Sequence, residues 1–365
     1  MRLNGPLVGL RIVEFDAIGP VPLAAMLLAD MGCEVVRIAR APNSGQAWDN
    51  TGGAILNRNR KHVHLDLKDP DDRDRALDLI ARADAVIEGF RPGVMERLGL
   101  GPEPCLARNP RLVFARMTGW GQTGPLALRA GHDLNYIAIT GALNAMGRAG
   151  EQPPVPLNLV GDYGGGSMFA VVGLLSAIIS ARATGRGQVV DVAMTDGTAS
   201  LTAMFHALAA GGLWSNARGI NLLDGSKPFY RCYACSDGRH VAVGALEPQF
   251  FTLLVKGLGL DPAVYNQFDP AGWPAMEQAF AEVFATRTRD AWAARFEGTD
   301  ACVSPVLDFA EAADHPHNRE RATLVEIDGI RQPATAPRFA ATPTSINPSR
   351  RGLIGIEEAV ADWSV

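Results

Sequence analysis

The sequence of 365 residues predicts an α/β fold, with a large Rossmann-like parallel-sheet domain and a smaller α+β domain. Three observations support this fold class. Short apolar runs alternate with helix-like segments through the first half, which is typical of strand–helix–strand units. Near residue 219 the alternation gives way to short strand-like pieces separated by glycines. The length corresponds to about two domains of roughly 150 residues each.

The first half contains five predicted strands, each a short apolar run with β-branched residues. They are Leu10–Phe15, Cys33–Ile38, His62–Leu67, Asp84–Phe90 and Arg111–Met117. Residues 22–31 and 69–83 have helical spacing, and the second segment begins with Pro70 and an acidic first turn, which are helix-start signals. Strands joined by helices in this way form a mostly parallel sheet with helices on both faces.

One uncharged segment, Gly164–Ala181, is long enough to be mistaken for a membrane span. It opens with three glycines, contains three serines and is followed by a turn and a strand-like run at residues 188–194. A buried core helix is therefore the preferred interpretation. A helix-like apolar segment follows at residues 198–213.

The second half predicts a smaller α+β unit over residues 225–315. Its expected elements are strands at 229–235 and 240–243 and helices at 248–258 and 273–287. Residues 331–350 are rich in Pro, Ser and Thr and have no periodicity, which predicts an extended segment. A short helix is expected at 356–363.

Composition excludes several functional classes. Lys plus Arg total 34 and Asp plus Glu total 39, and the net charge of −5 argues against a dedicated nucleic-acid-binding protein. The five cysteines are scattered, which indicates a reducing compartment, and the single CxxC at Cys232 and Cys235 lacks the further ligands of a zinc site. No signal peptide is recognised, so a cytoplasmic enzyme is expected. The absence of a GxGxxG or P-loop motif argues against NAD and NTP chemistry.

Basic residues cluster in or beside the predicted strands, and two interpretations are open. Near strand ends, these side chains would suit a polyanionic ligand such as a nucleotide diphosphate. Alternatively, they are separate solvated charges on the surface. The residues are Arg37, Arg40, Arg58, Arg60, Lys61 and Arg91.

The densest group of polar and glycine residues lies between positions 119 and 167. Ligands of open α/β sheets bind beyond the carboxyl ends of strands, so this region is a candidate site. Asp162 stands where the apolar helix should begin, and it is either an N-cap or a carboxylate facing a cleft. His132 is either structural or catalytic. As a pair, the two would supply the base and the acid that racemise a carbon next to a carbonyl.

Several long blocks resemble the family III CoA-transferases, and among them the racemases of that family. They are EGFRPGVMERLGLGP (88–102), ARMTGWGQTGP (115–125), GHDLNY (131–136), PLNLVGDYGGGSMF (156–169), GQVVDVAM (187–194) and VAVGALEPQF (241–250). The resemblance implies an interlocked homodimer, in which the active site lies between the large domain of one subunit and the small domain of the other. It also implies a large domain of residues 1–190 with 331–365, a linker helix region at 191–224, a small domain at 225–315 and a return linker at 316–330.

The resemblance further implies the roles of individual residues. In the family's racemases, the His of the GHD motif and the Asp of the GDYGGG motif exchange the α-proton of an acyl-CoA thioester, which assigns catalysis to His132 and Asp162. Glu247, in the GALEPQF motif, is expected to orient or support His132. Coenzyme A is expected as part of the substrate, with no other cofactor, no metal and no nucleic-acid or membrane partner. The residues expected to bind it are Arg40, Arg60, Arg91, Asp133 and Tyr136.

Two other functions stay open. The family's transferases use the same Asp as a nucleophile and generally lack the His, so the presence of both residues favours racemisation over acyl transfer. A CoA-thioester-binding protein without catalysis would not need the pair. One departure concerns the first turn, which reads Gly19-Pro-Val-Pro22 where racemases usually have Gly-Pro-Gly-Pro. Val21 is therefore expected to narrow the acyl pocket or to alter the loop.

Overall fold

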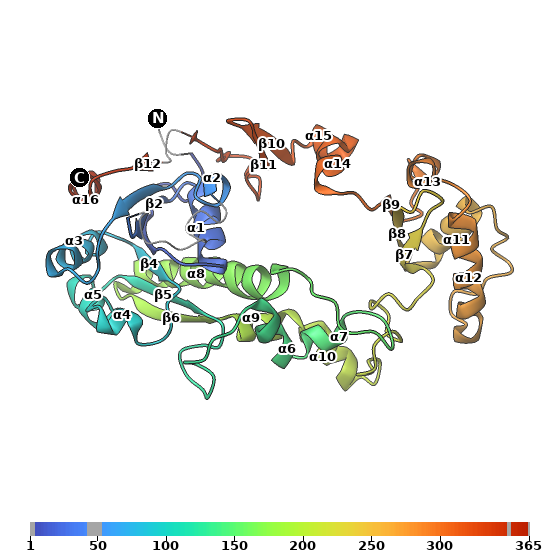
Figure 1. Ribbon diagram of the computed structural model, residues 1–365, viewed down its shortest axis with the longest axis horizontal. Helices are drawn as coiled ribbons and strands as arrows, with labels where there is room; N and C mark the ends of the chain where they lie inside the picture. Colours follow the sequence, from blue (N-terminus) through green and yellow to red (C-terminus); the bar gives the residue numbers. More distant parts are fainter. Residues whose placement is uncertain (1–3, 42–52, 349–351, 364–365) are drawn as a thin grey trace. The chain divides into compact units, whose positions relative to one another are not determined.

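The computed structural model describes residues 4–41, 53–348 and 352–363, and the chain divides into two compact units (Figure 1). The first unit comprises residues 1–142, 156–203 and 321–365. The second comprises residues 143–155 and 204–320. The chain therefore leaves the first unit and returns to it, and the C-terminal segment belongs with the N-terminal half.

The first unit is built on a seven-stranded sheet in the order β12-β3-β2-β1-β4-β5-β6. Every pair of neighbouring strands is parallel, which confirms the predicted α/β class. The strands are β1 (Arg11–Phe15), β2 (Glu34–Ala39), β3 (Lys61–His64), β4 (Ala85–Glu88), β5 (Val113–Thr118), β6 (Gln188–Ala193) and β12 (Gly352–Leu353). The chain builds outward from β1 in one direction and from β4 in the other, so the switch point of the topology lies between β1 and β4.

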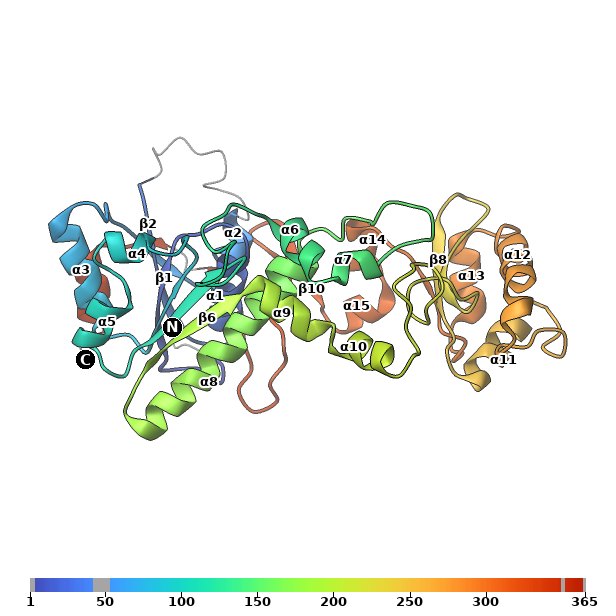
Figure 2. The same cartoon turned by 90° about the horizontal axis from the view of Figure 1, so that it is seen from below.

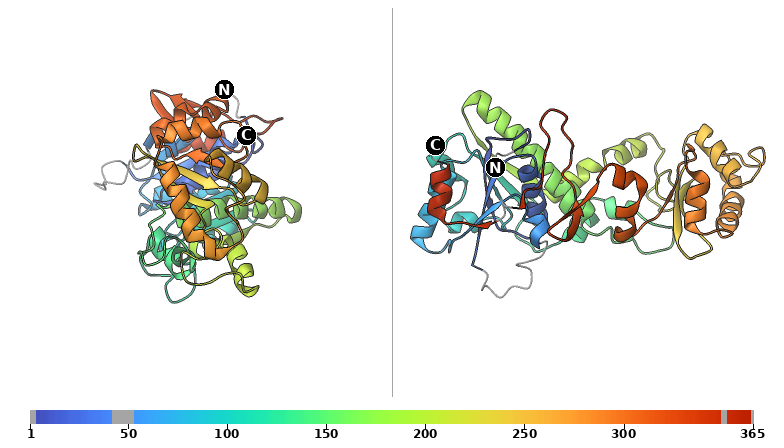
Figure 3. Two further views of the ribbon diagram at one scale, coloured as in Figure 1. Left: turned by 90° about the vertical axis from the view of Figure 1, so that its right-hand side faces the viewer. Right: turned by 90° about the horizontal axis from the view of Figure 1, so that it is seen from above.

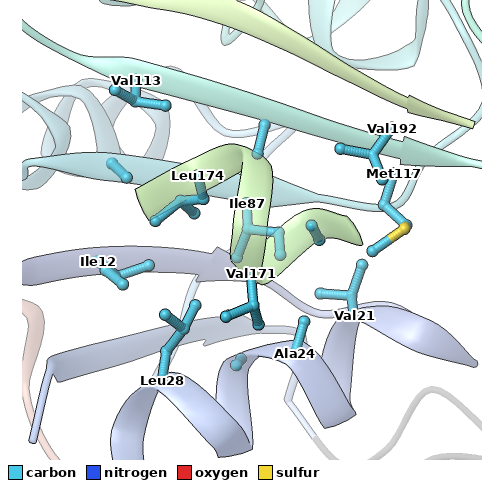
Figure 4. Packing of buried hydrophobic residues seen from close by; sticks show 14 of the residues in the cluster. Ile12, Val21, Ala24, Leu28, Ile87, Val113, Met117, Val171, Leu174 and Val192 are labelled. Atoms are coloured by element: carbon cyan, nitrogen blue, oxygen red, sulfur yellow. The ribbon is translucent and has the colours of Figure 1, made fainter. Parts of the chain in front are cut away.

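Helices cover both faces of this sheet because successive strand residues point to opposite sides. On β1, Ile12 packs with α1 and α8, whereas Val13 packs with α3 and α16. Figure 4 shows the first of these two cores, with Leu28 of α1 and Leu174 of α8 beside Ile87. The helices of this unit are α1 (Pro20–Asp30), α2 (Gly53–Leu56), α3 (Pro70–Ile80), α4 (Val94–Arg97), α5 (Pro102–Arg108), α6 (Asp133–Ile139), α8 (Phe169–Thr184), α9 (Met194–Leu201) and α16 (Ile356–Asp362). Two more, α7 (Ala142–Ala145) and α10 (Ala203–Ala210), begin where the chain passes into the second unit.

The C-terminal helix is part of this packing. Figure 3 shows α16, in red next to the C-terminus, against the blue helices of the N-terminal half. Ile356, Ala359 and Trp363 are buried in the same core as α3. Beside it, β12 extends the sheet from β3, and a two-stranded hairpin of β10 (Leu324–Ile327) and β11 (Ile330–Pro333) precedes it in the chain.

The long apolar helix is buried on one face only. A π-helical segment, η2 (Leu159–Met168), continues directly into α8, which runs along the sheet beside β6 (Figure 2). Ala170, Leu174 and Ile178 enter the core, whereas Val172 and Ile179 are exposed. By length and composition, residues 159–184 would suffice to cross a membrane, yet half of the most apolar window is buried inside the protein.

The second unit has its own sheet and core. Its antiparallel sheet contains β7 (Tyr230–Ala234), β8 (His240–Gly244) and β9 (Val303–Pro305). The core is largely aromatic, with Phe280, Phe284 and Trp292 almost completely buried. The helices are α11 (Pro248–Gly257), η3 (Pro270–Gly272), α12 (Trp273–Phe284), α13 (Arg289–Phe296), α14 (Phe309–Asp314) and α15 (Pro316–Glu320). Cys232 and Cys235 are free thiols on or just after β7, the first exposed and the second buried.

A buried ion pair links β1 to the segment that enters β3. The Arg60 guanidinium bonds to the Glu14 carboxylate, and both side chains are completely buried. The same guanidinium donates to the Leu56 carbonyl and, at 2.9 Å, to Asn57 Oδ1. Burial raises the pKa of Glu14, and the Arg60 charge opposes that rise. Each buried charge is therefore stabilised only while its partner is also charged.

We predict that Arg60→Met destabilises the protein by about 3–5 kcal/mol, because Glu14 is then buried without its counter-ion. The free energy of unfolding in urea measures the loss. The matched control is Lys61→Met, since the Lys61–Asp362 pair at 2.5 Å is solvent-exposed and should cost less than about 1 kcal/mol. Equal losses in the two variants would contradict a structural role for the buried pair.

Candidate active site

The candidate site lies at the topological switch point, beyond the carboxyl ends of β1 and β4. Ligands of open α/β sheets bind at this position. The two loops that follow these strands are in close contact, because a Cβ atom on Gly89 would lie 2.9 Å from both the Ala17 and the Val21 side chains. Only glycine fits there, so the loops meet at the switch point.

Asp162 reaches this point from η2. Its side chain is half-buried, and its Oδ2 accepts a hydrogen bond from Asn158 Nδ2 at 3.3 Å. A Cβ atom on Gly19 would lie 3.2 Å from the same oxygen, and Gly19 has a φ of 85°. The carboxylate therefore lies against the loop after β1, in a place that a glycine keeps open.

Glycines also allow η2 to approach its neighbours closely. A Cβ atom on Gly197 of α9 would lie 1.9 Å from the Gly165 carbonyl oxygen, and one on Gly166 would lie 3.0 Å from Pro20 Cβ of α1. The first distance excludes any side chain at Gly197, and the second leaves little room for one at Gly166. The π-helical turn seats Asp162 at the sheet because its backbone packs directly on α9 and α1.

His132 precedes α6 as its N-cap, and its side chain is exposed. Its backbone N–H donates to Asn135 Oδ1 at 3.1 Å, which fixes the start of the helix. The His132 charge lowers the pKa of Asp162, so the two predicted catalytic groups are electrostatically coupled. Within the described ranges no hydrogen bond joins the two side chains.

Asp133, the residue after His132, is buried and bonds to the backbone of η2. Its Oδ2 accepts hydrogen bonds from the N–H groups of Gly161 and Asp162, each at 2.7 Å. The turns that carry His132 and Asp162 are thereby tied together.

Tyr136 shapes the wall behind His132. Its hydroxyl donates to the Gly131 carbonyl, and its ring meets Trp120 edge-on with 4.8 Å between centroids. A Cβ atom on Gly119 would lie 2.1 Å from this ring. Burial, and secondly the Asp162 charge, raises the pKa of Tyr136 to about 12. Its hydroxyl is thus satisfied within the protein, and the ring is a packing element of the site.

Burial is the main influence on Asp162. Burial raises its pKa, and the Asp133 charge adds to the increase. The bond from Asn158 and the His132 charge act in the opposite direction, and the pKa remains raised. A raised pKa makes the carboxylate a stronger base and brings it closer to the operating pH, where acid–base catalysis is most effective.

Most residues of the expected basic cluster form ion pairs with carboxylates of the same chain. Arg37 bonds to Asp16, Arg58 to Asp30 at 2.6 Å, and Lys61 to Asp362. For these basic residues the sequence left two interpretations open, a polyanion-binding site or separate solvated charges. Most of them do neither, because each is paired with a carboxylate of the protein.

Arg60 is a correction to the predicted set of coenzyme A contacts. Its side chain has no exposed surface and is held by Glu14, so its guanidinium is not presented to a ligand. Arg40 and Arg91, in contrast, are exposed. Arg91 follows β4 at the switch point, and its charge lowers the pKa of Tyr136, the residue whose ring packs near the turn of His132.

Val21 does not line an open pocket. It belongs to α1 and is completely buried in the core, against Gly89 (Figure 4). The expectation that Val21 narrows an acyl pocket directly is therefore wrong, because its side chain points into the core.

Glu247 lies in the second unit, at the N-cap of α11, and its side chain is exposed. Its expected action on His132 stays a prediction.

One set of supporting residues was not identified from the sequence. Glu88, at the end of β4, accepts the Phe90 N–H at 2.7 Å and the Arg116 Nε–H at 3.0 Å. Arg116 of β5 also bonds to Glu96 at 2.7 Å. Burial raises the pKa of Glu88 to about 7. These bonds fix the loop that carries Arg91. The sequence did contain a sign of them, because Glu88 and Arg116 are charged residues inside otherwise apolar strands.

Comparison with known proteins agrees with this geometry. The model of "CoA-transferase family III" matches residues 7–350. Alpha-methylacyl-CoA racemase of Mus musculus is 44% identical over 95% of this chain and 90% of its own, and the Homo sapiens enzyme is 43% identical over 96% and 90%. Acetyl-CoA:oxalate CoA-transferase of Acetobacter aceti is 30% identical over 92% of this chain and 90% of its own.

A solved structure gives the same fold. A CAIB/BAIF family protein from Brucella suis superposes with a TM-score of 0.81 at 25% identity, covering 98% of each chain. The family match spans nearly the whole chain and includes the turns that carry His132 and Asp162. This protein belongs to the family III CoA-transferases.

Proposed function

We propose that this protein is a racemase of 2-methylacyl-CoA thioesters. The observation that carries the proposal is the pair of hydrogen bonds by which Asp133, the residue after His132, holds the backbone of Gly161 and Asp162, so that the turns bearing the two groups are tied together. The relatives named alpha-methylacyl-CoA racemase, at 43% and 44% identity over nearly the whole chain, support this member of the family.

The reaction follows from the placement of the two groups. His132 removes the α-proton of one epimer, the C–H electron pair moves into the thioester as an enolate, and Asp162 delivers a proton to the opposite face. For the other epimer the roles reverse. Coenzyme A takes part only as the carrier of the acyl group.

Acyl transfer is the second candidate, because Asp162 would serve there as a nucleophile. The 30% identity to an acetyl-CoA:oxalate CoA-transferase favours it. Its intermediate would be an acyl-aspartyl anhydride, which hydroxylamine traps as a hydroxamate. Trapping at Asp162, together with movement of coenzyme A to a free acid, would replace the racemase proposal.

We also propose that the protein acts as a homodimer. Val172 and Ile179 of α8 are 61% and 70% exposed, and the neighbouring edge strand β6 exposes Val189. Apolar side chains exposed on neighbouring elements in this way are typical of an interface. Light scattering of the wild type should give twice the mass of one chain. The double variant Val172→Asp with Ile179→Asp should give the mass of the monomer. A monomeric wild type would overturn the proposal.

We predict that His132→Ala and Asp162→Asn each lower α-proton exchange by roughly 10²–10⁴-fold, because each removes one acid/base group. Deuterium incorporation from D2O into a 2-methylacyl-CoA measures the exchange. Asp196→Asn, an exposed carboxylate on α9, is the control and should keep full exchange. Full exchange in the folded Asp162→Asn variant would rule out the mechanism.

The pH dependence follows from the raised pKa of Asp162. For the epimer whose proton Asp162 removes, kcat/KM should rise with pH as Asp162 ionises, at a pH above the ordinary carboxyl value of about 3.9. Asn158→Ala removes the bond that lowers this pKa, so the rise should move to higher pH. Profiles measured between about pH 4 and pH 8 test both statements, and an unmoved profile would contradict the assignment.

Arg91 should contribute to the affinity for coenzyme A through charge. We predict that Arg91→Ala raises KM for the thioester by about tenfold, equivalent to about 1.4 kcal/mol, and reduces its salt dependence. Arg108→Ala is the matched control, since Arg108 is already paired with Asp78 at 2.7 Å on the surface. An unchanged KM with unchanged salt dependence would remove Arg91 from the binding site.

A further inference from the structure

Asp133 makes bonds that its expected role does not explain. Its Oδ2 accepts the N–H groups of both Gly161 and Asp162 at 2.7 Å. These bonds connect the first residue of α6 to a turn 28 and 29 residues further along the chain. The carboxylate thus holds the very backbone unit from which the Asp162 side chain projects.

The approach of Asp133 depends on a glycine. A Cβ atom on Gly161 would lie 2.7 Å from Asp133 Oδ2 and 3.1 Å from a side-chain carbon of Ile137. A side chain at position 161 would therefore displace the carboxylate or the turn. The contact is specific to this pair of segments.

The charge of Asp133 acts on Asp162 as well. Its Oδ1 is buried and has no hydrogen-bond partner in the described part of the chain, and no cation there forms an ion pair with it. The negative charge is consequently only partly neutralised, by two backbone dipoles. Close to Asp162, it disfavours the ionised form of that carboxyl group.

We propose that Asp133 is a positioning residue for catalysis: its buried carboxylate accepts the N–H groups of Gly161 and Asp162 and so fixes the turn that presents Asp162. This assignment rests on the proposed racemase function. It replaces the expectation that the Asp133 side chain binds coenzyme A, because the side chain is only 5% exposed and its Oδ2 is engaged by the backbone.

Other groups act on Asp162 from the elements packed around η2. Two of them belong to α6 and its N-cap. The His132 charge favours the ionised form of Asp162, and the Asp162 charge in turn raises the pKa of Tyr136. Asn158 donates a bond, and Arg91 acts on the neighbouring Tyr136. On α9 the charged side chain is Asp196, which is exposed, and α1 ends in Asp30, which is paired with Arg58. Asp133 is thus the carboxylate that raises the pKa of Asp162.

Two variants separate position from charge. Asp133→Asn keeps an acceptor oxygen for the two N–H groups but removes the charge, whereas Asp133→Ala removes both. The matched control is Asp69→Asn, because Asp69 Oδ1 likewise accepts two backbone N–H groups, from Asp71 and Asp72, at the start of α3. All are assayed by deuterium exchange into a 2-methylacyl-CoA across pH.

We expect Asp133→Asn to move the acidic limb of kcat/KM to lower pH for the epimer that Asp162 deprotonates, with KM changed less than about threefold. Asp133→Ala should lower kcat by roughly 10–100-fold with a similar KM, since a misplaced acid/base group costs rate. Asp69→Asn should match the wild type. A KM that rises more than about tenfold with kcat unchanged, or an unmoved acidic limb, would overturn the proposal.

A second readout does not depend on activity. Amide hydrogen exchange of residues 158–168 should be faster in Asp133→Ala than in wild type, because the Gly161 and Asp162 N–H groups lose their acceptor. If wild type shows no α-proton exchange, the racemase function fails while this readout still tests the positioning role. Unchanged amide exchange in that segment would overturn the role, and Asp133→Asn tests it if the alanine variant does not fold.

Discussion

The site depends on the contact between the backbones of η2 and α9. A Cβ atom on Gly197 would lie 1.9 Å from the Gly165 carbonyl oxygen, so the two segments meet with no side chain between them. Asp162 is one turn before that contact. Any residue larger than glycine would move η2 outward, and the carboxylate would leave its position beside Gly19. π-helical segments often occur at functional sites, where they re-aim a side chain at some cost in hydrogen-bond geometry.

The parallel sheet determines which other groups meet Asp162. Because the chain order diverges between β1 and β4, the loops after these strands leave a place for a ligand at their carboxyl ends. Glu88 bonds to the Phe90 N–H and to Arg116, and so fixes the loop that brings in Arg91. Asp133 connects η2 to α6, which begins after His132. The proposed base, acid and cation therefore come from three segments that are held by buried polar bonds.

The sequence predicted the architecture well because strand and helix patterns are local. The run Leu10–Phe15 contains β1, and the acidic turn at Asp69 begins α3. The pairing of basic residues was not local: Arg58 bonds to Gln332, and Lys61 to Asp362, which follow hundreds of positions later. No periodicity indicates such partners. Asp133 was recognised only through the family motif, and its bonds to η2 depend on how two distant turns pack.

The electrostatics of Asp162 suit a reaction that runs in both directions. An ordinary carboxyl group has a pKa of about 3.9 and an ordinary imidazole has a pKa of about 6.5. A proton shared between them would therefore reside almost entirely on the imidazole. A racemase built on such a pair would strongly prefer one protonation state and slow one direction. Burial and the Asp133 charge raise the pKa of Asp162 and narrow that difference. A carboxyl group that gives and takes a proton in alternate turnovers needs a raised proton affinity, since it must be protonated in one direction of the reaction and ionised in the other.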